Sequence, residues 1–297
     1  MNNQFEILIN NRFVINKKVG RGSFGDVHLG HDKSNNQLVA LKLEHKDNKK
    51  MLEHEYNVYR DIGNNKSKIP KIFWYGNEGE YRVMVMEYLG ESLESLLNKC
   101  GRKMSLKTTM MIGLQIFDLI HSLHCSNYVH RDLKPENFLI GIGDNRHFVH
   151  MIDFGLCKRF KNEERVHCKM VTGKKLVGTA RYASINSHQG IELSRRDDME
   201  SLLYLMVYFR KGTLPWQGMP GKNREAKYEA IRQKKVSTTP EQLCQGLPVE
   251  FTHFLQHIRS LDFKEKPKYR YLRNLLLSVI KRNNYSMDFR YDWCFHT

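Results

Sequence analysis

The stretch that decides the fold runs from residue 130 to residue 137 and reads HRDLKPEN, and the triplet DFG follows at 153–155. Asp132 stands five residues before Asn137, and a second carboxylate, Asp153, opens a glycine turn. Phosphoryl transfer needs a group that orients the nucleophile and accepts its proton, and hard oxygen ligands that hold Mg²⁺ against phosphate oxygens. Asp132 is the candidate for the first role, and Asn137 and Asp153 are the candidates for the second. Polar clusters are usually plain surface loops, but eight residues in this order are hard to obtain by chance.

A glycine loop lies upstream and has the spacing GxGxxGxV. Glycines let the backbone approach phosphates closely, although a dinucleotide fold uses the same spacing. In that fold a helix should follow the loop. Here residues 27–29 alternate like a strand and residues 32–36 suit a hairpin turn, which favours a lid over nucleotide phosphates. The residues expected in this lid are Gly20, Arg21, Gly22, Ser23, Phe24, Gly25, Asp26 and Val27.

The strand expected at residues 38–43 contains a lysine, Lys42. A lysine in a half-buried strand is usually an edge residue whose ammonium reaches water. At this distance from the glycine loop, Lys42 instead fits the motif lysine that contacts the α and β phosphates. Such a lysine needs a carboxylate from the next helix. We predict Glu55, with Glu53 as the alternative, because a shift of two residues on a helix turns the side chain elsewhere.

Residues 81–90, YRVMVMEYLG, have the pattern of a buried strand that leads into a loop. We place the junction between two parts of the chain there, residues 1–88 and residues 89–297. Met86 would then lie at the back of a base pocket, and backbone groups near Glu87 and Leu89 would face the adenine. A core strand that ends in a turn would give the same pattern.

Beyond this junction the apolar period changes from two to about 3.6 residues, which predicts a mainly helical second part. Residues 106–125 and 198–209 are apolar on most faces, as buried helices are. His121 and His124 resemble a metal pair because they are three positions apart on a helix. No carboxylate or thiol set of suitable spacing lies nearby, so we expect ordinary helix histidines.

Composition bounds the class of protein. A chain of 297 residues can bury a substantial core, and its longest apolar run, 202–209, is far shorter than the ~18 residues of a membrane span. The six cysteines form no CxxC pair, which suggests reduced thiols in a cytoplasmic or nuclear protein. The formal charge of +16 requires a partner of opposite sign, and nucleic acid, anionic lipid and acidic or phosphorylated protein all qualify.

The order of glycine loop, strand lysine, HRDxxxxN and DFG resembles the protein kinase signature over essentially the whole chain. Lys134 in the first of these stretches looks like the serine/threonine form of the catalytic loop. Residues 178–186, GTARYASIN, replace the Ala-Pro-Glu stretch of the general family. Together with residues 194–202, SRRDDMESL, and residues 214–218, LPWQG, they closely resemble the casein kinase 1 family.

This resemblance implies an α+β, bilobal protein kinase fold with a small β-rich N-lobe and a larger, mainly helical C-lobe. It implies a kinase, usually monomeric, that uses ATP and Mg²⁺ and phosphorylates serine or threonine, with Lys134 offsetting charge on the moving phosphoryl group. Activity without phosphorylation of the activation segment is also expected. Further positions that match the family's nucleotide contacts are Val19, Ala40, Leu139 and Ile152.

The resemblance also implies a preference for sites preceded by phosphoserine, phosphothreonine or acidic residues. In that family a basic pocket beside the activation segment holds the upstream phosphate, and the matching positions are Arg181, Lys227 and Gly218, with Lys174 close by. The composition agrees, because residues 158–181 carry eight lysines and arginines against two glutamates. A charge run is more often a solvated face, but guanidinium and ammonium groups beside a catalytic centre suit phosphate recognition.

Two other classes of protein remain as alternatives. A pseudokinase scaffold would need a damaged lysine, HRD or DFG position, and these positions are intact. A nucleic-acid binder would use the positive charge, but no RNA or DNA motif appears, so we expect no specific nucleic-acid partner. The sequence therefore predicts a cytoplasmic or nuclear protein kinase without a membrane span, acting on acidic or phosphorylated proteins.

Overall fold

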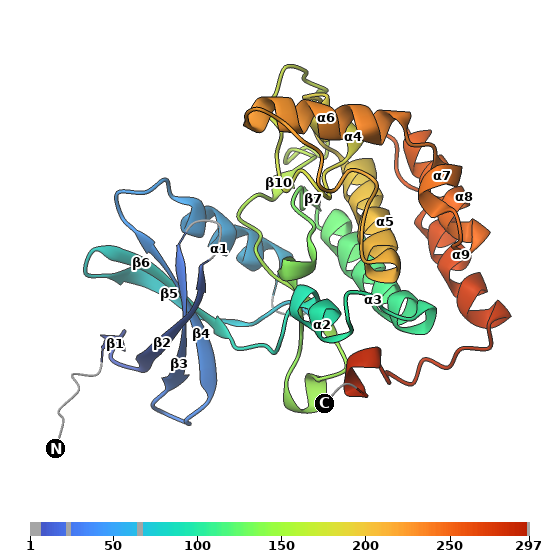
Figure 1. Cartoon of the computed structure of the whole chain (residues 1–297). Helices are drawn as coiled ribbons and strands as arrows, with labels where there is room; N and C mark the ends of the chain where they lie inside the picture. Colours follow the sequence, from blue (N-terminus) through green and yellow to red (C-terminus); the bar gives the residue numbers. More distant parts are fainter. Residues whose placement is uncertain (1–6, 22–24, 64–67, 296–297) are drawn as a thin grey trace. The chain divides into compact units, whose positions relative to one another are not determined.

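The structure is a computed structural model that describes residues 7–21, 25–63 and 68–295. The chain divides into two compact units. The first unit comprises Met1–Glu91 and Leu139–Gly155, and the second comprises Ser92–Phe138 and Leu156–Thr297. The first unit is built on a β-sheet and the second is mainly helical (Figure 1).

Within the described residues, the first unit contains a six-stranded sheet in the order β1-β2-β3-β4-β6-β5. Every neighbouring pair in this sheet is antiparallel. The strands are β1 (Leu8–Ile9), β2 (Phe13–Arg21), β3 (Asp26–Asp32), β4 (Leu38–His45), β5 (Ile72–Glu78) and β6 (Tyr81–Glu87). Along the chain, helix α1 (Met51–Ile62) lies between β4 and β5. The strands β8 (Phe138–Ile140) and β9 (Val149–Met151) pair in a separate two-stranded sheet.

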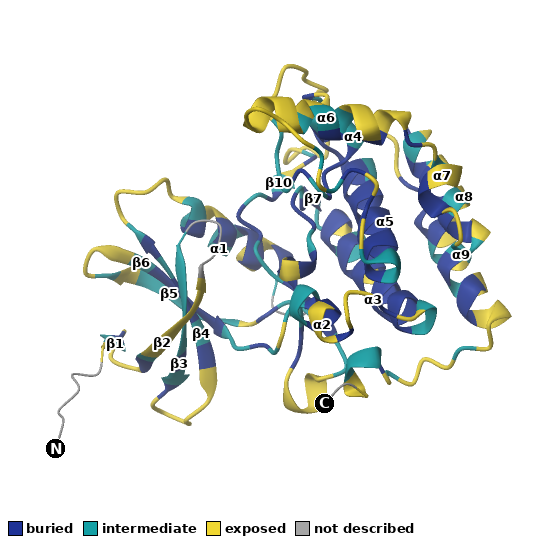
Figure 2. Ribbon diagram, viewed as in Figure 1, coloured by how far each residue is buried: buried dark blue, intermediate teal, exposed yellow. Residues whose placement is uncertain are grey.

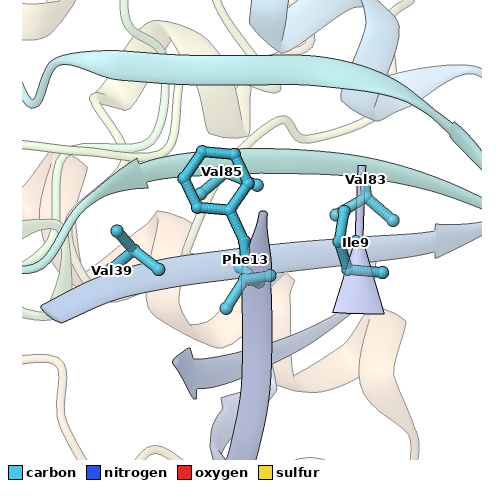
Figure 3. Close-up of a cluster of buried hydrophobic side chains, with 6 residues drawn as sticks. Ile9, Phe13, Val39, Val83 and Val85 are labelled. Carbon is cyan, nitrogen blue, oxygen red and sulfur yellow. The ribbon is translucent and has the colours of Figure 1, made fainter. Parts of the chain in front are cut away.

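The alternation of side chains along β4 separates a core face from a polar face. Val39 and Leu41 are fully buried in an apolar cluster with Phe13, Val83 and Val85 (Figure 3). The intervening residues of β4 lie on the opposite face. The sheet therefore gives Lys42 a fixed direction away from this cluster.

The second unit is organised around two buried helices, α3 (Leu106–Cys125) and α5 (Arg195–Lys211), which are coloured as buried along most of their length in Figure 2. The sequence predicts the bounds of α3 correctly, whereas α5 begins three residues before the expected start at residue 198. Asp197 in its first turn accepts a 2.7 Å hydrogen bond from the backbone N–H of the N-cap residue Ser194. The remaining helices are α2 (Leu93–Lys99), α4 (Ile185–His188), α6 (Arg224–Ser237), α7 (Pro240–Cys244), α8 (Val249–Arg259) and α9 (Tyr269–Arg282).

Short elements complete the second unit. The strands β7 (Tyr128–Val129) and β10 (Lys158–Arg159) pair in a two-stranded sheet. The unit also contains two 3₁₀ helices, η1 (Pro135–Asn137) and η3 (Asp292–Cys294). A third 3₁₀ helix, η2 (Gly143–Asn145), belongs to the first unit. In the part of the chain that the structure describes, no helix combines the length and apolarity needed to span a bilayer.

The two helix histidines have neighbours inside the protein. His124 contacts the Tyr269 hydroxyl through Nδ1 at 2.6 Å and Asp198 through Nε2 at 3.0 Å. The ring of His121 stacks on the ring of Tyr269, with 4.1 Å between centroids. Among the described residues, no group of three or more histidine, cysteine, aspartate or glutamate side chains is placed to hold a metal ion.

Candidate active site

An ion pair lies inside the first unit. The Lys42 Nζ atom is 2.5 Å from Glu55 Oε2 and 3.5 Å from Asp153 Oδ1, and both Lys42 and Glu55 are buried. Glu53, one half-turn earlier on α1, instead lies 3.6 Å from the Lys50 ammonium. Of the two carboxylates considered from the sequence, Glu55 is therefore the partner of Lys42.

Electrostatics keep this lysine charged. Burial lowers the pKa of Lys42, but the attraction of Glu55 and Asp153 outweighs burial, so the pKa lies above its ordinary value. For Glu55 the effects have the opposite signs: burial raises its pKa, and the neighbouring Lys42 opposes that rise. A cation fixed between two carboxylates is suited to hold phosphate oxygens.

A carboxylate on β4, Glu44, fixes the beginning of α1. The first N–H groups of a helix need acceptors, and the N-cap residue Lys50 provides no side-chain hydrogen bond. Glu44 Oε1 accepts hydrogen bonds from the backbone N–H of Met51 at 3.0 Å and of Leu52 at 3.3 Å. Arg82 Nη1 donates to Glu44 Oε2 at 3.2 Å. The strand that carries Lys42 therefore also holds the helix that carries its partner.

The DFG triplet follows β9 in the same unit. Asp153 has a φ of 64°, in the left-handed region that non-glycine residues rarely adopt. Phe154 is fully buried and packs edge-on against Tyr59 of α1, with 4.7 Å between ring centroids. Backbone strain is maintained only where packing overdetermines it, and the buried Phe154 supplies that packing next to Asp153.

The residues predicted to bind the nucleotide belong to the first unit wherever the structure describes them. Val19 and Gly20 lie on β2, and Gly20 pairs with Val27 on β3. Gly22, Ser23 and Phe24 lie outside the described residues, as does the side chain of Arg21.

Other predicted nucleotide contacts come from separate parts of the sequence. Ala40 pairs with Met86 across β4 and β6, which places two of them side by side. Leu139 and Ile152 lie on or next to the β8–β9 pair, and the backbone N–H of Gly90 donates to the Ile140 carbonyl at 2.7 Å. This bond joins the β8–β9 pair to the segment after β6, which contains Leu89 and directly follows Glu87, the last residue of β6.

In the second unit, Asp132 is held through both carboxylate oxygens. Lys134 Nζ donates to Asp132 Oδ2 at 2.9 Å. The backbone N–H and the hydroxyl of Thr179 both donate to Asp132 Oδ1 at 2.8 Å. The predicted base and the predicted charge-neutralising lysine are therefore in direct contact, and the activation segment fixes the carboxylate plane.

Asn137 suits a role as a metal ligand. Its side-chain nitrogen donates to the Asp132 carbonyl at 2.9 Å, which fixes the amide and assigns its oxygen to the other end. Amide and carboxylate oxygens are the hard ligands that Mg²⁺ accepts. Asn137 carries the amide type of ligand, and Asp153 carries the carboxylate type.

Sequence reasoning missed the residue that anchors the catalytic loop. Asp198 is buried in α5 and accepts hydrogen bonds from the backbone N–H of His130 at 2.7 Å and of Arg131 at 2.9 Å. Burial raises its pKa, but the bonds from His124 and the loop outweigh that effect and lower it overall. The available signal was a carboxylate in the first turn of a helix whose later residues are apolar nearly all round.

Three segments that carry predicted phosphate-binding residues are linked to one another. Arg181 contacts the hydroxyls of Tyr182 at 3.3 Å and Tyr208 at 3.5 Å, and its carbonyl accepts a 2.7 Å bond from Trp216 Nε1. Gly218 follows in the same turn as Trp216, is exposed and has a φ of 72°.

The loop that follows this turn packs against the start of α6. A side chain at Gly221 would collide with the backbone nitrogen of Lys227, so the two backbones lie in direct contact. The Lys227 side chain is exposed. The segment bearing Arg181 is thus bonded to the turn that bears Gly218, and the loop after that turn contacts the helix that bears Lys227.

Lys174 belongs to a different group of charges. Its ammonium is in close contact with the Glu192 carboxylate, to which Lys158 Nζ also donates at 2.7 Å. Arg131 Nη1 lies 4.0 Å from the other oxygen of Glu192. Burial raises the pKa of Glu192, but the two lysines outweigh burial and lower it overall.

A comparison with known families identifies the class to which these features belong. Residues 13–275 match the family model described as Protein kinase domain. The match covers most of the chain, so the chain belongs to the protein kinase family. Its fold is the α+β kinase fold that the sequence predicts, and its class is a phosphotransferase that acts on proteins. Domains of this family generally use ATP and Mg²⁺.

Proposed function

We propose that this protein kinase phosphorylates serine and threonine residues that follow a phosphorylated or acidic residue, as expected from its resemblance to the casein kinase 1 family. The observation that carries this proposal is that the segments bearing Arg181, Gly218 and Lys227 are connected by contacts within the unit that contains Asp132. Basic groups beside a catalytic carboxylate attract a substrate that already bears negative charge.

In the proposed mechanism, Asp132 orients the substrate hydroxyl and accepts its proton. Thr179 and Lys134 hold the two oxygens of Asp132, so the carboxylate needs little reorganisation before the reaction. Lys134 also offsets the charge on the phosphoryl group as it moves. The direct contact between Lys134 and Asp132 supports this pairing of roles.

The nucleotide is assigned to residues of the first unit. Lys42 positions the α and β phosphates, and Glu55 keeps the ammonium in place. Asp153 and Asn137 would hold Mg²⁺, which neutralises phosphate charge when bound. The described residues of the glycine loop and the β4–β6 pair supply the surroundings of the nucleotide.

The proposal can be tested with four peptides that differ at two positions. Three have a serine acceptor with phosphoserine, aspartate or serine three residues upstream, and the fourth has a tyrosine acceptor with upstream phosphoserine. We expect turnover to fall from phosphoserine to aspartate to serine and to be absent on tyrosine. Equal rates on the three serine peptides would refute the proposed substrate class, and transfer to tyrosine would refute the acceptor class.

A further inference from the structure

Lys235 is a fully buried lysine on α6, a helix whose surface is largely exposed in Figure 2. Its ammonium donates to the Ala180 carbonyl at 2.9 Å and also contacts the Ala183 carbonyl. It lies over the rings of Tyr204 and Trp216, about 5 Å from each centroid. The catalytic roles described above do not use this residue.

Burial of the Lys235 ammonium is energetically unfavourable, which argues for a role beyond packing. Burial lowers the pKa of Lys235 to about 7, while Glu200 attracts and Arg259 repels its charge. His188, whose ring binds the same Ala180 carbonyl at 3.0 Å, also faces it. A buried cation needs specific compensation, and here backbone carbonyls and aromatic faces provide most of it.

The two carbonyls that Lys235 binds flank Arg181. The carbonyl of Arg181 itself is bound by Trp216, and its guanidinium lies over the rings of Tyr182 and Tyr208, 5.6 Å from each centroid. Both sides of the Arg181 backbone are therefore fixed. An arginine fixed in this way loses less conformational entropy when it binds a phosphate.

Lys235 also belongs to the helix that carries Lys227. Eight residues separate the two lysines, which corresponds to about 12 Å along the helix axis. Trp216 belongs to the turn that contains Gly218. Lys235 and Trp216 therefore tie the backbone of Arg181 to both segments that supply the other predicted phosphate-binding residues.

We propose that Lys235, acting with Trp216, is a positioning residue that sets Arg181 relative to Lys227 for recognition of a phosphate upstream of the substrate acceptor. This inference rests on the proposed function, because it assigns a role within the same phosphate-binding surface. Lys235 does not touch substrate in this role. It acts through the backbone of residues 180–183.

The test compares Lys235→Met with Lys234→Met, a matched loss of charge at the adjacent, exposed position on α6. For each variant, kcat and KM are measured on the phosphoserine peptide and on its unphosphorylated twin. We expect Lys235→Met to lower the ratio of the two kcat/KM values about tenfold, mainly through KM of the phosphoserine peptide. Lys234→Met should keep the wild-type ratio.

A purely structural role would give a different result, in which Lys235→Met lowers activity on both peptides in parallel and leaves the ratio unchanged. That outcome would overturn the inference. If Lys235→Met does not fold, as judged by thermal melting, Trp216→Phe decides the question. This variant keeps an aromatic ring but removes the N–H that binds the Arg181 carbonyl, so we expect a lower ratio, and an unchanged ratio would overturn the inference.

The peptide preference of the wild-type enzyme distinguishes a failure of this inference from a failure of the proposed function. A wild-type enzyme without preference for the phosphoserine peptide would refute the proposed function itself. A clear wild-type preference that survives in folded Lys235→Met would refute the positioning role alone.

Discussion

Lys42 and Glu44 project from the same face of β4 and bind two different parts of α1. Lys42 forms an ion pair with Glu55 in the middle of the helix, and Glu44 accepts the backbone N–H groups of Met51 and Leu52 at its start. In many kinases the position of the corresponding helix controls activity, because the lysine–glutamate pair must be formed. Here a second bond from the same strand helps to hold the helix in the paired position.

Removal of the Glu44 carboxylate should therefore reduce both stability and activity. Glu44→Ala leaves two helix N–H groups and Arg82 without this acceptor, so we expect unfolding in urea to require about 2 kcal/mol less free energy. We also expect kcat/KM for ATP to fall about tenfold. Glu44→Gln, which keeps an acceptor oxygen, should lose less.

The matched control is Glu53→Ala on the same helix. Glu53 forms a surface ion pair with Lys50, and such pairs contribute about 0–1 kcal/mol. Equal losses for Glu44→Ala and Glu53→Ala would contradict a special role for the bond from β4.

Asp132→Asn should separate nucleotide binding from phosphoryl transfer. The variant keeps the size of the side chain but removes the base, and it places an amide where Lys134 and Thr179 now find a carboxylate. We expect kcat to fall ~10²–10⁴-fold, while the ATP dissociation constant measured by calorimetry stays near the wild-type value. Near-normal turnover would remove Asp132 from the assigned role.

Arg181→Ala combined with Lys227→Ala should abolish the preference for the phosphoserine peptide, because both predicted cations are lost. ATP affinity should stay unchanged, since the predicted nucleotide contacts belong to the other unit. The control removes the same two kinds of charge from α9, as Arg270→Ala with Lys281→Ala. If the first double variant retains full preference, the phosphate-binding surface has been assigned to the wrong residues.

Lys235 should make stability depend on pH in a defined direction. Its pKa is about 7 in the folded protein and 10.5 in the reference state, so between these values the unfolded chain binds more protons. The contribution of Lys235 to stability is therefore lowest below pH 7 and increases as pH rises above it. In urea unfolding, wild type should gain about 1 kcal/mol relative to Lys235→Met per pH unit from pH 7 to 9. A constant difference would show that Lys235 does not titrate in this range.

Much of the fold and of the catalytic machinery could be predicted from the sequence, because these features depend on local order along the chain. The spacing of the HRDLKPEN and DFG stretches, the strand after the glycine loop and the helical period of residues 106–125 are all visible without coordinates. A motif of this kind fixes residue types at short separations, and an amphipathic period reports the burial of one face directly.

Only the tertiary structure decided the partners of isolated charges. It selected Glu55 over Glu53, gave Lys174 a partner in Glu192, and buried Asp198 beneath the catalytic loop. It also turned Lys235, one of two adjacent lysines on α6, into the protein interior. The partner of a buried charge comes from a segment distant in sequence, so its identity depends on packing that no local pattern records.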